Sequence, residues 1–310
     1  MKDRKFQQGA WHHIYVITED GGVLFYRITD RLSFFTVASV FARRYNMIVL
    51  GLSIMFTHFH MMLKALDLTQ LRSFMQQVLA AFSRIIVEDR TLERPVFKRP
   101  FGSAPKVSEK DQRASLIYLY NNPVEKKLCK RAADDRWTFL RYAKDAFPFS
   151  SKLVKRKVRF ALRTAADVVD REAAAGRYLR PALLRNLFQP LSREEQEQLT
   201  DYIIQCYQFI CIDEAVGRFD SYESMLDACD ASSGKEFDVG EVYDPYSDVP
   251  YREMAHMAAQ AHLFDNWELL HLGPQSKKRW FQAFRTGCNA TERQVRRFMH
   301  IGEDESVMGK

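Results

Sequence analysis

Two histidines separated by one residue are the first group in this chain whose types and spacing suggest chemistry. His58 and His60 lie in the apolar run Ile54-Met-Phe-Thr-His-Phe-His-Met-Met-Leu63, which is typical of a strand. Alternate residues of a strand point to the same face, so we expect both imidazoles on one side of a sheet. Neutral imidazoles bind Mn²⁺, Zn²⁺ or Ni²⁺ well and Mg²⁺ poorly. The pair predicts either a metal site or two half-buried histidines, and taken alone it favours the second.

A tyrosine and an amide on a later segment could complete such a site. Residues 109–122 predict a helix, in which residues three and four apart are neighbours. Tyr120 lies among apolar residues and is expected in the core, whereas Tyr118 lies on a small, polar face with Asn122 one turn along. Because Pro123 disfavours helical geometry at the residue before it, we expect the helix to end there, with Tyr118 in its last turn. An ordinary surface tyrosine is the alternative, and helical phase alone favours it.

The elements that must position these residues alternate between strand and helix in the first half of the chain. The pattern predicts a strand at 13–17 and a helix at 30–45 with Asp30 as its N-cap. Strands at 47–50 and 52–63 are expected to meet at a turn at Gly51, followed by a helix at 68–88 and a helix capped by Ser108. This order predicts an α+β fold, with helices on an antiparallel sheet.

The second half of the chain is mostly helical in pattern. A boundary near 148–160 predicts one domain at 1–148 and a helical C-terminal region at 149–310. Residues 160–230 and 251–301 predict helices, and the acidic, turn-rich residues 231–250 predict a loop. Residues 276–301 have the layout of a helix-turn-helix, whose second helix enters the major groove of DNA. A terminal helical hairpin with a basic face is the alternative. In the first interpretation Val295, Phe298 and Met299 pack inward and Arg293, Arg296 and Arg297 contact DNA.

Composition and charge narrow the class of protein. The formal net charge of +7 and the pI near 9.1 favour a polyanionic partner, although many basic proteins bind no nucleic acid. The five cysteines are scattered, which argues against a disulfide framework or a zinc finger. The chain has no signal-peptide pattern and no apolar run long enough to span a membrane. We therefore expect a soluble cytoplasmic protein with no membrane partner.

A basic loop with interspersed aromatic residues could bind a nucleic-acid strand. Such loops combine backbone charge with base stacking, and a solvated loop is the alternative. The residues expected to flank the site in this way are Lys98, Arg99, Phe101, Lys106 and Arg113.

The segments around the histidines and the tyrosine together resemble a known family. Met55-Phe-Thr-His-Phe-His60, followed by Tyr118-Leu-Tyr-Asn-Asn-Pro-Val124, is similar to the motifs of the single-tyrosine HUH transposases. This is the insertion-sequence-200-like superfamily, which includes the REP-associated tyrosine transposases. The resemblance covers roughly residues 10–145, and Trp137 and Tyr142 fall where members often carry an aromatic pair. Phe56-Thr57 replaces the usual Pro-Asn, and Tyr120 stands where a histidine is frequent.

The resemblance implies a function for each matched residue. His58 and His60 would bind a divalent metal ion, Mg²⁺ or Mn²⁺, with Asn122 as the third ligand, and Tyr118 would be the nucleophile. The implied protein is an HUH-type DNA endonuclease and transposase, which cleaves and rejoins single-stranded or hairpin DNA through a 5′-phosphotyrosine. The resemblance also implies that residues 1–148 are its catalytic domain and that its sheet is ferredoxin-like. A DNA-binding regulator that keeps the fold without catalysis is one alternative, and a metal-dependent phosphoesterase that uses water is another. A homodimer is left open.

Overall fold

A four-stranded antiparallel sheet forms the centre of the computed structural model, which describes residues 5–18, 21–93, 96–97, 101–231 and 246–302. The strands are β1 (Trp11–Ile17), β2 (Ile48–Ile54), β3 (His58–Lys64) and β4 (Gly102–Lys106), in the order β2-β3-β1-β4. Helix α1 (Ile28–Arg44) connects β1 to β2, and α2 (Leu68–Arg90) connects β3 to β4. This is the split βαβ topology of the ferredoxin-like fold. The predicted α+β class and its antiparallel sheet are confirmed.

The turn between β2 and β3 lies at 55–57, and the prediction that it lies at Gly51 is wrong. Gly51 is inside β2, directly after a bulge at Leu50. A glycine in a strand interior often marks a bulge or the close approach of another group. Here the group is the hydroxyl of Tyr120, because a Cβ atom on Gly51 would lie only 2.9 Å from its oxygen.

Two helix ends also differ from the prediction. Helix α1 begins at Ile28, so Asp30 is its third residue rather than its N-cap, and its carboxylate accepts the backbone N–H of Arg27 at 3.0 Å. The same carboxylate forms a fully buried ion pair with Arg90 at 3.0 Å. Asp30 therefore stabilises the first turn of α1 and its contact with α2.

Helix α3 (Glu109–Glu125) begins at the predicted cap, Ser108, but continues past Pro123. Lys126 N–H reaches the carbonyl of Asn122 and Leu128 N–H reaches that of Pro123, so the turns around the proline are closed by other hydrogen bonds. The prediction that Tyr118 lies in the last turn is wrong, because the helix extends beyond Asn122.

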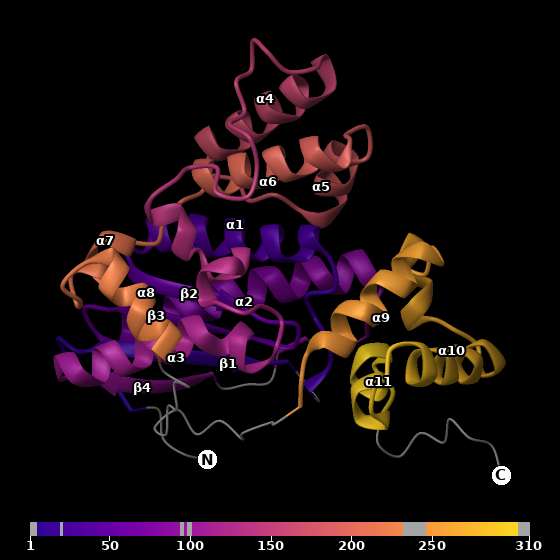
Figure 1. Ribbon diagram of the computed structural model, residues 1–310, viewed down its shortest axis with the longest axis horizontal. Helices are drawn as coiled ribbons and strands as arrows, with labels where there is room; N and C mark the ends of the chain where they lie inside the picture. Colours follow the sequence, from indigo (N-terminus) through magenta and orange to yellow (C-terminus); the bar gives the residue numbers. More distant parts are fainter. Residues whose placement is uncertain (1–4, 19–20, 94–95, 98–100, 232–245, 303–310) are drawn as a thin grey trace.

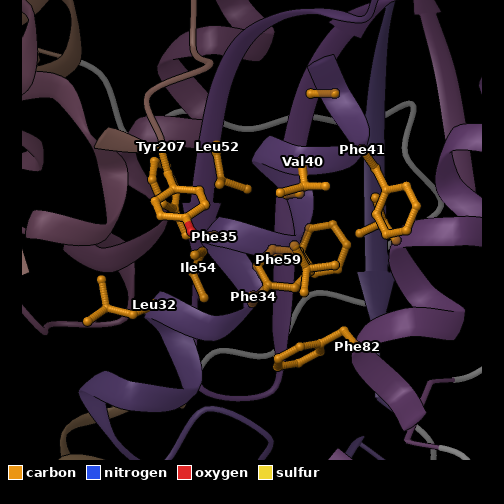
Figure 2. Packing of buried hydrophobic residues seen from close by; sticks show 14 of the residues in the cluster. Leu32, Phe34, Phe35, Val40, Phe41, Leu52, Ile54, Phe59, Phe82 and Tyr207 are labelled. Carbon is orange, nitrogen blue, oxygen red and sulfur yellow. The ribbon is translucent and has the colours of Figure 1, made fainter. Parts of the chain in front are cut away.

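One face of the sheet is covered by α1 and α2 (Figure 1). Phe59, Met61 and Leu63 of β3 and Ile14 and Val16 of β1 point to this side, and all are almost completely buried. Figure 2 shows how aromatic rings from both helices pack around Phe59, whose ring centroid is 4.5 Å from that of Phe34. This apolar core is the main hydrophobic core of the protein.

Helices from the second half of the chain extend the same core. Figure 1 shows α4 (Phe160–Ala174), α5 (Pro181–Phe188) and α6 (Arg193–Cys206) stacked on α1, and the short α7 (Ile212–Val216) follows them. Tyr207, between α6 and α7, packs in the cluster around Phe35 (Figure 2). The core therefore contains residues from both sides of position 148, and the predicted domain division there stays a prediction.

Helix α3 covers the other face of the sheet, and the remaining helices form two smaller groups. α8 (Tyr222–Ala231) packs on α3, with Met225 and Cys229 in a cluster around Leu119. α9 (Val249–Gln260), α10 (Pro274–Gly287) and α11 (Glu292–Met299) form a core of their own with Tyr26 and Phe56. The prediction of a largely helical C-terminal region is confirmed. Within the residues described above, no helix has the length and apolar character that crossing a membrane requires.

Candidate active site

The face of the sheet under α3 carries the two predicted histidines. His58 is the first residue of β3 and His60 is its third, so the strand presents both imidazoles to the same side. Their ring centroids are 5.0 Å apart with the rings edge to face, and both side chains are buried. The Thr57 hydroxyl lies 3.0 Å from Nδ1 of His58. The expected arrangement on one face is confirmed.

A third histidine joins this pair, and the sequence-based reasoning missed it. His13 lies on β1, and its Nε2 is 3.1 Å from Nδ1 of His60. The residue is completely buried. The sequence feature that could have identified His13 is its alternation with Ile14 and Val16. This alternation places His13 on the opposite face of β1 from these core residues. Sequence alone could not supply the pairing of β1 with β3, which places Tyr15 opposite His60 and His13 opposite Met62.

Helix α3 places Tyr118 directly against these imidazoles. The Tyr118 ring centroid is 5.4 Å from that of His60, edge to face, and 5.7 Å from that of His13. Tyr118 is half-buried, so the site is not sealed from solvent. A phenol next to two imidazoles that a sheet holds in place is an arrangement suited to nucleophilic chemistry.

The second tyrosine of α3 has a structural role, as predicted. Tyr120 is buried, and its hydroxyl donates a hydrogen bond to the carbonyl of Leu50 at 3.1 Å. Burial raises the pKa of this phenol far above its ordinary value, which keeps it protonated. Tyr120 thus attaches α3 to the bulge in β2.

Asn122 is placed differently from the other three predicted residues. Its side-chain amide is buried and donates a hydrogen bond to the carbonyl of Tyr118 at 3.4 Å. Ring contacts group Tyr118 with His60 and His13, whereas this hydrogen bond connects Asn122 to the backbone of α3. Its role as a metal ligand stays a prediction.

Burial sets the charge state of the central imidazole. The pKa of His60 lies well below its ordinary value, first because the ring is desolvated and then because His58, His13 and Lys126 add positive charge nearby. His60 is therefore neutral at pH 7, which is the state in which an imidazole binds a metal ion. A buried neutral histidine without a metal has the same property.

The donor set fits a divalent ion in part. Two imidazoles on alternate strand residues are suitable ligands for Mn²⁺. Among the residues that the structure describes, no group of three or more His, Cys, Asp or Glu side chains is arranged to hold a metal ion. A third protein ligand would be of another type, as the amide of Asn122 is, or would be replaced by the substrate.

The residues predicted to bind DNA have varied surroundings. Lys98 and Arg99 lie outside the described residues. Phe101 and Lys106 are buried and so are not part of an exposed strand-binding surface, whereas Arg113 is exposed.

The predicted helix-turn-helix consists of α10, a turn and α11, with Val295, Phe298 and Met299 buried as expected. Arg293 is exposed, and Arg296 pairs with Glu292 at 3.0 Å. The remaining arginine, Arg297, lies against Gly21, where a Cβ atom would be 3.2 Å from its Nε. Helix α11 also packs on the segment before α1, since the Tyr26 hydroxyl donates to the carbonyl of Phe298 at 2.5 Å. DNA binding by these arginines stays a prediction.

Comparison with known proteins adds one similar structure. No family model matches the chain, and no curated protein is similar to it in sequence. A solved structure described as a REP-associated tyrosine transposase bound to a REP hairpin aligns with 46% of this chain and 86% of its own. The sequence identity is 19% and the TM-score is 0.35. A likeness at this level carries no argument about function, which has to come from the site.

Proposed function

We propose that this protein cleaves and rejoins single-stranded DNA, with Tyr118 as the nucleophile. The observation that carries the proposal is the position of the Tyr118 ring, 5.4 Å from His60 and 5.7 Å from His13. The motif resemblance around His58, His60 and Tyr118 supports it. So does the basic net charge of +7, which favours a polyanionic substrate.

The reaction forms one phosphate ester while it breaks another. The Tyr118 oxygen attacks the scissile phosphorus, the bond from phosphorus to the 3′ oxygen breaks, and the phenolic proton is balanced by the proton that the released 3′ oxygen takes up. The product is a 5′-phosphotyrosine and a free 3′ hydroxyl. Because the ester energy is kept in the covalent link, rejoining to a 3′ hydroxyl needs no nucleotide cofactor.

The residues around Tyr118 have separate tasks in this scheme. His58 and His60 would hold a divalent ion, with Asn122 as the expected third ligand. When bound, such an ion withdraws charge from a non-bridging oxygen of the scissile phosphate. His13 would be a positioning residue: its Nε2 lies 3.1 Å from Nδ1 of His60, and a proton on that Nδ1 would fix the ring and leave Nε2 of His60 as the electron-pair donor.

The test is to trap the covalent adduct on denaturing gels, using labelled single-stranded and hairpin oligonucleotides with Mn²⁺ or Mg²⁺. We expect wild type to form an adduct and Tyr118→Phe to reduce it by roughly a thousandfold or more. Tyr120→Phe is the matched control on the same helix, and it should keep the adduct because that hydroxyl bonds to Leu50 instead.

Two outcomes would replace the proposal. Binding of DNA without any adduct or cleavage, equal in wild type and Tyr118→Phe, would make the protein a DNA-binding regulator. Cleavage that needs the metal but not Tyr118 would make it a phosphoesterase that uses water.

A further inference from the structure

A cavity of about 470 Å³ lies between the start of α1, the turn before β3 and helix α9. Such a volume is within the usual range for small-molecule sites. Its lining contains three arginines, Arg27, Arg31 and Arg252, and one carboxylate, Asp135. We call this cavity the arginine pocket. It is separate from the imidazoles, although Phe56 in its wall is two residues before His58.

Two of these arginines are held rigidly by aromatic rings. The guanidinium carbon of Arg27 lies 4.4 Å from the Trp267 ring centroid, and that of Arg31 lies 4.7 Å from the Phe56 ring centroid. Arg31 is only 9% exposed. Cation–π contacts fix the planes of the guanidinium groups but use none of their N–H donors.

The donors of both groups are unused within the described part of the chain. There, neither Arg27 nor Arg31 makes an ion pair or a side-chain hydrogen bond, and Nε of each is buried with no acceptor. Oδ2 of the nearby Asp30 pairs with Arg90 at 3.0 Å, and Oδ1 of Asp135 accepts the backbone N–H of Trp137 at 2.8 Å, while among the described residues neither carboxylate forms an ion pair with Arg27 or Arg31. Leaving charged donors buried without an acceptor costs free energy, so each such group calls for an explanation.

We propose that the arginine pocket binds a phosphate ester of nucleotide size. Three arginines against one carboxylate leave an excess of positive charge that suits a phosphate. A planar carboxylate can be satisfied by one guanidinium fork, whereas the several oxygens of a phosphate can accept from two. Ile28, Leu128 and Ala255 supply the apolar wall for the organic part of the ligand.

The ligand is either a free nucleotide or one nucleotide of a DNA strand, and both present the same phosphate chemistry. The pocket includes Arg27 and Ile28 at the start of α1, and Arg252 of α9 lies across from them. A ligand in it would therefore bridge helix α1 and the C-terminal helices. This proposal does not depend on catalysis by Tyr118.

The experiment measures binding of dTMP, thymidine and inorganic phosphate by calorimetry and by thermal stabilisation of the full chain. We expect dTMP to bind and to raise the Tm, inorganic phosphate to bind more weakly, and thymidine to do neither. Arg27→Gln should weaken dTMP binding at least tenfold, and Arg163→Gln, at an exposed arginine of α4, should leave it unchanged.

A second pair of variants avoids the buried arginines. Ala259 is exposed on α9 and lines the pocket, so Ala259→Glu should prevent dTMP binding by repelling the phosphate while the fold is kept. Ala259→Gln, which has the same shape without the charge, should bind dTMP as wild type does. Any one of three outcomes would overturn the proposal. Thymidine and dTMP could bind equally, dTMP binding could be unchanged in both Arg27→Gln and Ala259→Glu, or no phosphate probe could bind.

The source of the phosphate is decided in the Tyr118→Phe variant, which cannot form an adduct. Displacement of dTMP by a single-stranded oligonucleotide would assign the pocket to a nucleotide of the strand, and its absence would assign the pocket to a free nucleotide. Loss of cleavage in Tyr118→Phe with dTMP binding intact separates this proposal from the proposed function. Cleavage by wild type without any dTMP binding would refute the pocket alone.

Discussion

The two faces of the central sheet are built from the same strands, but the face under α3 places a group of buried imidazoles beside its apolar residues. On the α1–α2 side, β1 and β3 present Ile14, Val16 and Phe59 to a dense aromatic core. On the α3 side, the alternate residues His13 and His60 are buried just as completely. Fully buried apolar groups stabilise the fold, whereas fully buried imidazoles need partners to be tolerated. The two faces are therefore expected to respond to different changes, the first to loss of apolar volume and the second to protons and metal ions.

The largest effect on stability should come from the apolar face. Phe59→Ala removes a ring that is 0% exposed, and we expect it to lower the free energy of unfolding by about 3–5 kcal/mol. Urea denaturation measures the change. Phe160→Ala, at a ring that is 73% exposed, is the control and should change little. A small effect of Phe59→Ala would mean that this core repacks, and the contrast between the faces would be weaker than it looks.

The imidazole face should respond to a metal ion instead. We expect Mn²⁺ to stabilise wild type by about 2.7 kcal/mol when present at 100 times its dissociation constant, and EDTA to reverse the change. The double variant His58→Ala, His60→Ala should show no stabilisation. If it is stabilised as much as wild type, the ion binds elsewhere and the metal assignment fails.

The next effect concerns His13 alone. His13→Phe should lower Mn²⁺ affinity about 10- to 100-fold, because His60 loses the acceptor that orients its ring. In His13→Gln a side-chain oxygen can accept the same hydrogen bond, so that variant should recover part of the affinity. Calorimetry with Mn²⁺ measures both. Equal affinity in the two variants would reduce His13 to a packing residue.

The smallest effect is on the pH dependence of stability without metal. Burial holds the pKa of His12 below 6.5, and that of His60 lies well below the same value. Below about pH 6.5 the unfolded chain therefore binds protons that the folded chain does not, so stability falls as the pH decreases from that value toward the folded-state pKa. His12→Gln should make this decrease shallower in urea titrations between pH 7 and 5, and His262→Gln, at a side chain 81% exposed, should leave it unchanged. A steeper decrease in His12→Gln would contradict the sign.

Local periodicity was enough to predict which side of β3 carries His58 and His60 and to assign Tyr120 to the core. Both follow from alternation along a strand or phase around a helix, which the chain encodes within a few residues. The order of strands and helices was likewise enough for the α+β class with its antiparallel sheet.

Features that depend on distant partners could not be predicted in this way. His13 became part of the site only through the register of β1 on β3. Asp30 has the residue type of an N-cap. Its actual partner, Arg90, lies at the far end of α2 and could not be inferred from the residues around Asp30. Pro123 looked like a helix end, but the turns around it are closed by contacts that a proline rule does not include. For His13 and Asp30 tertiary contacts outweighed a local preference, whereas at Pro123 local backbone hydrogen bonds did so.

Gly51, inside β2, also affects the distance between helix α3 and the sheet. The missing side chain at Gly51 fixes how near Tyr120 can come, and therefore the height of α3 above the sheet. Tyr118 and Tyr120 are about 200° apart around the helix, so the helix meets the sheet with one tyrosine on each flank. A larger residue at 51 would push the Tyr120 side of the helix away from the sheet. Because a helix moves as a rigid rod, Tyr118 would then tilt relative to His60. We therefore expect a substitution at position 51 to alter the geometry around Tyr118.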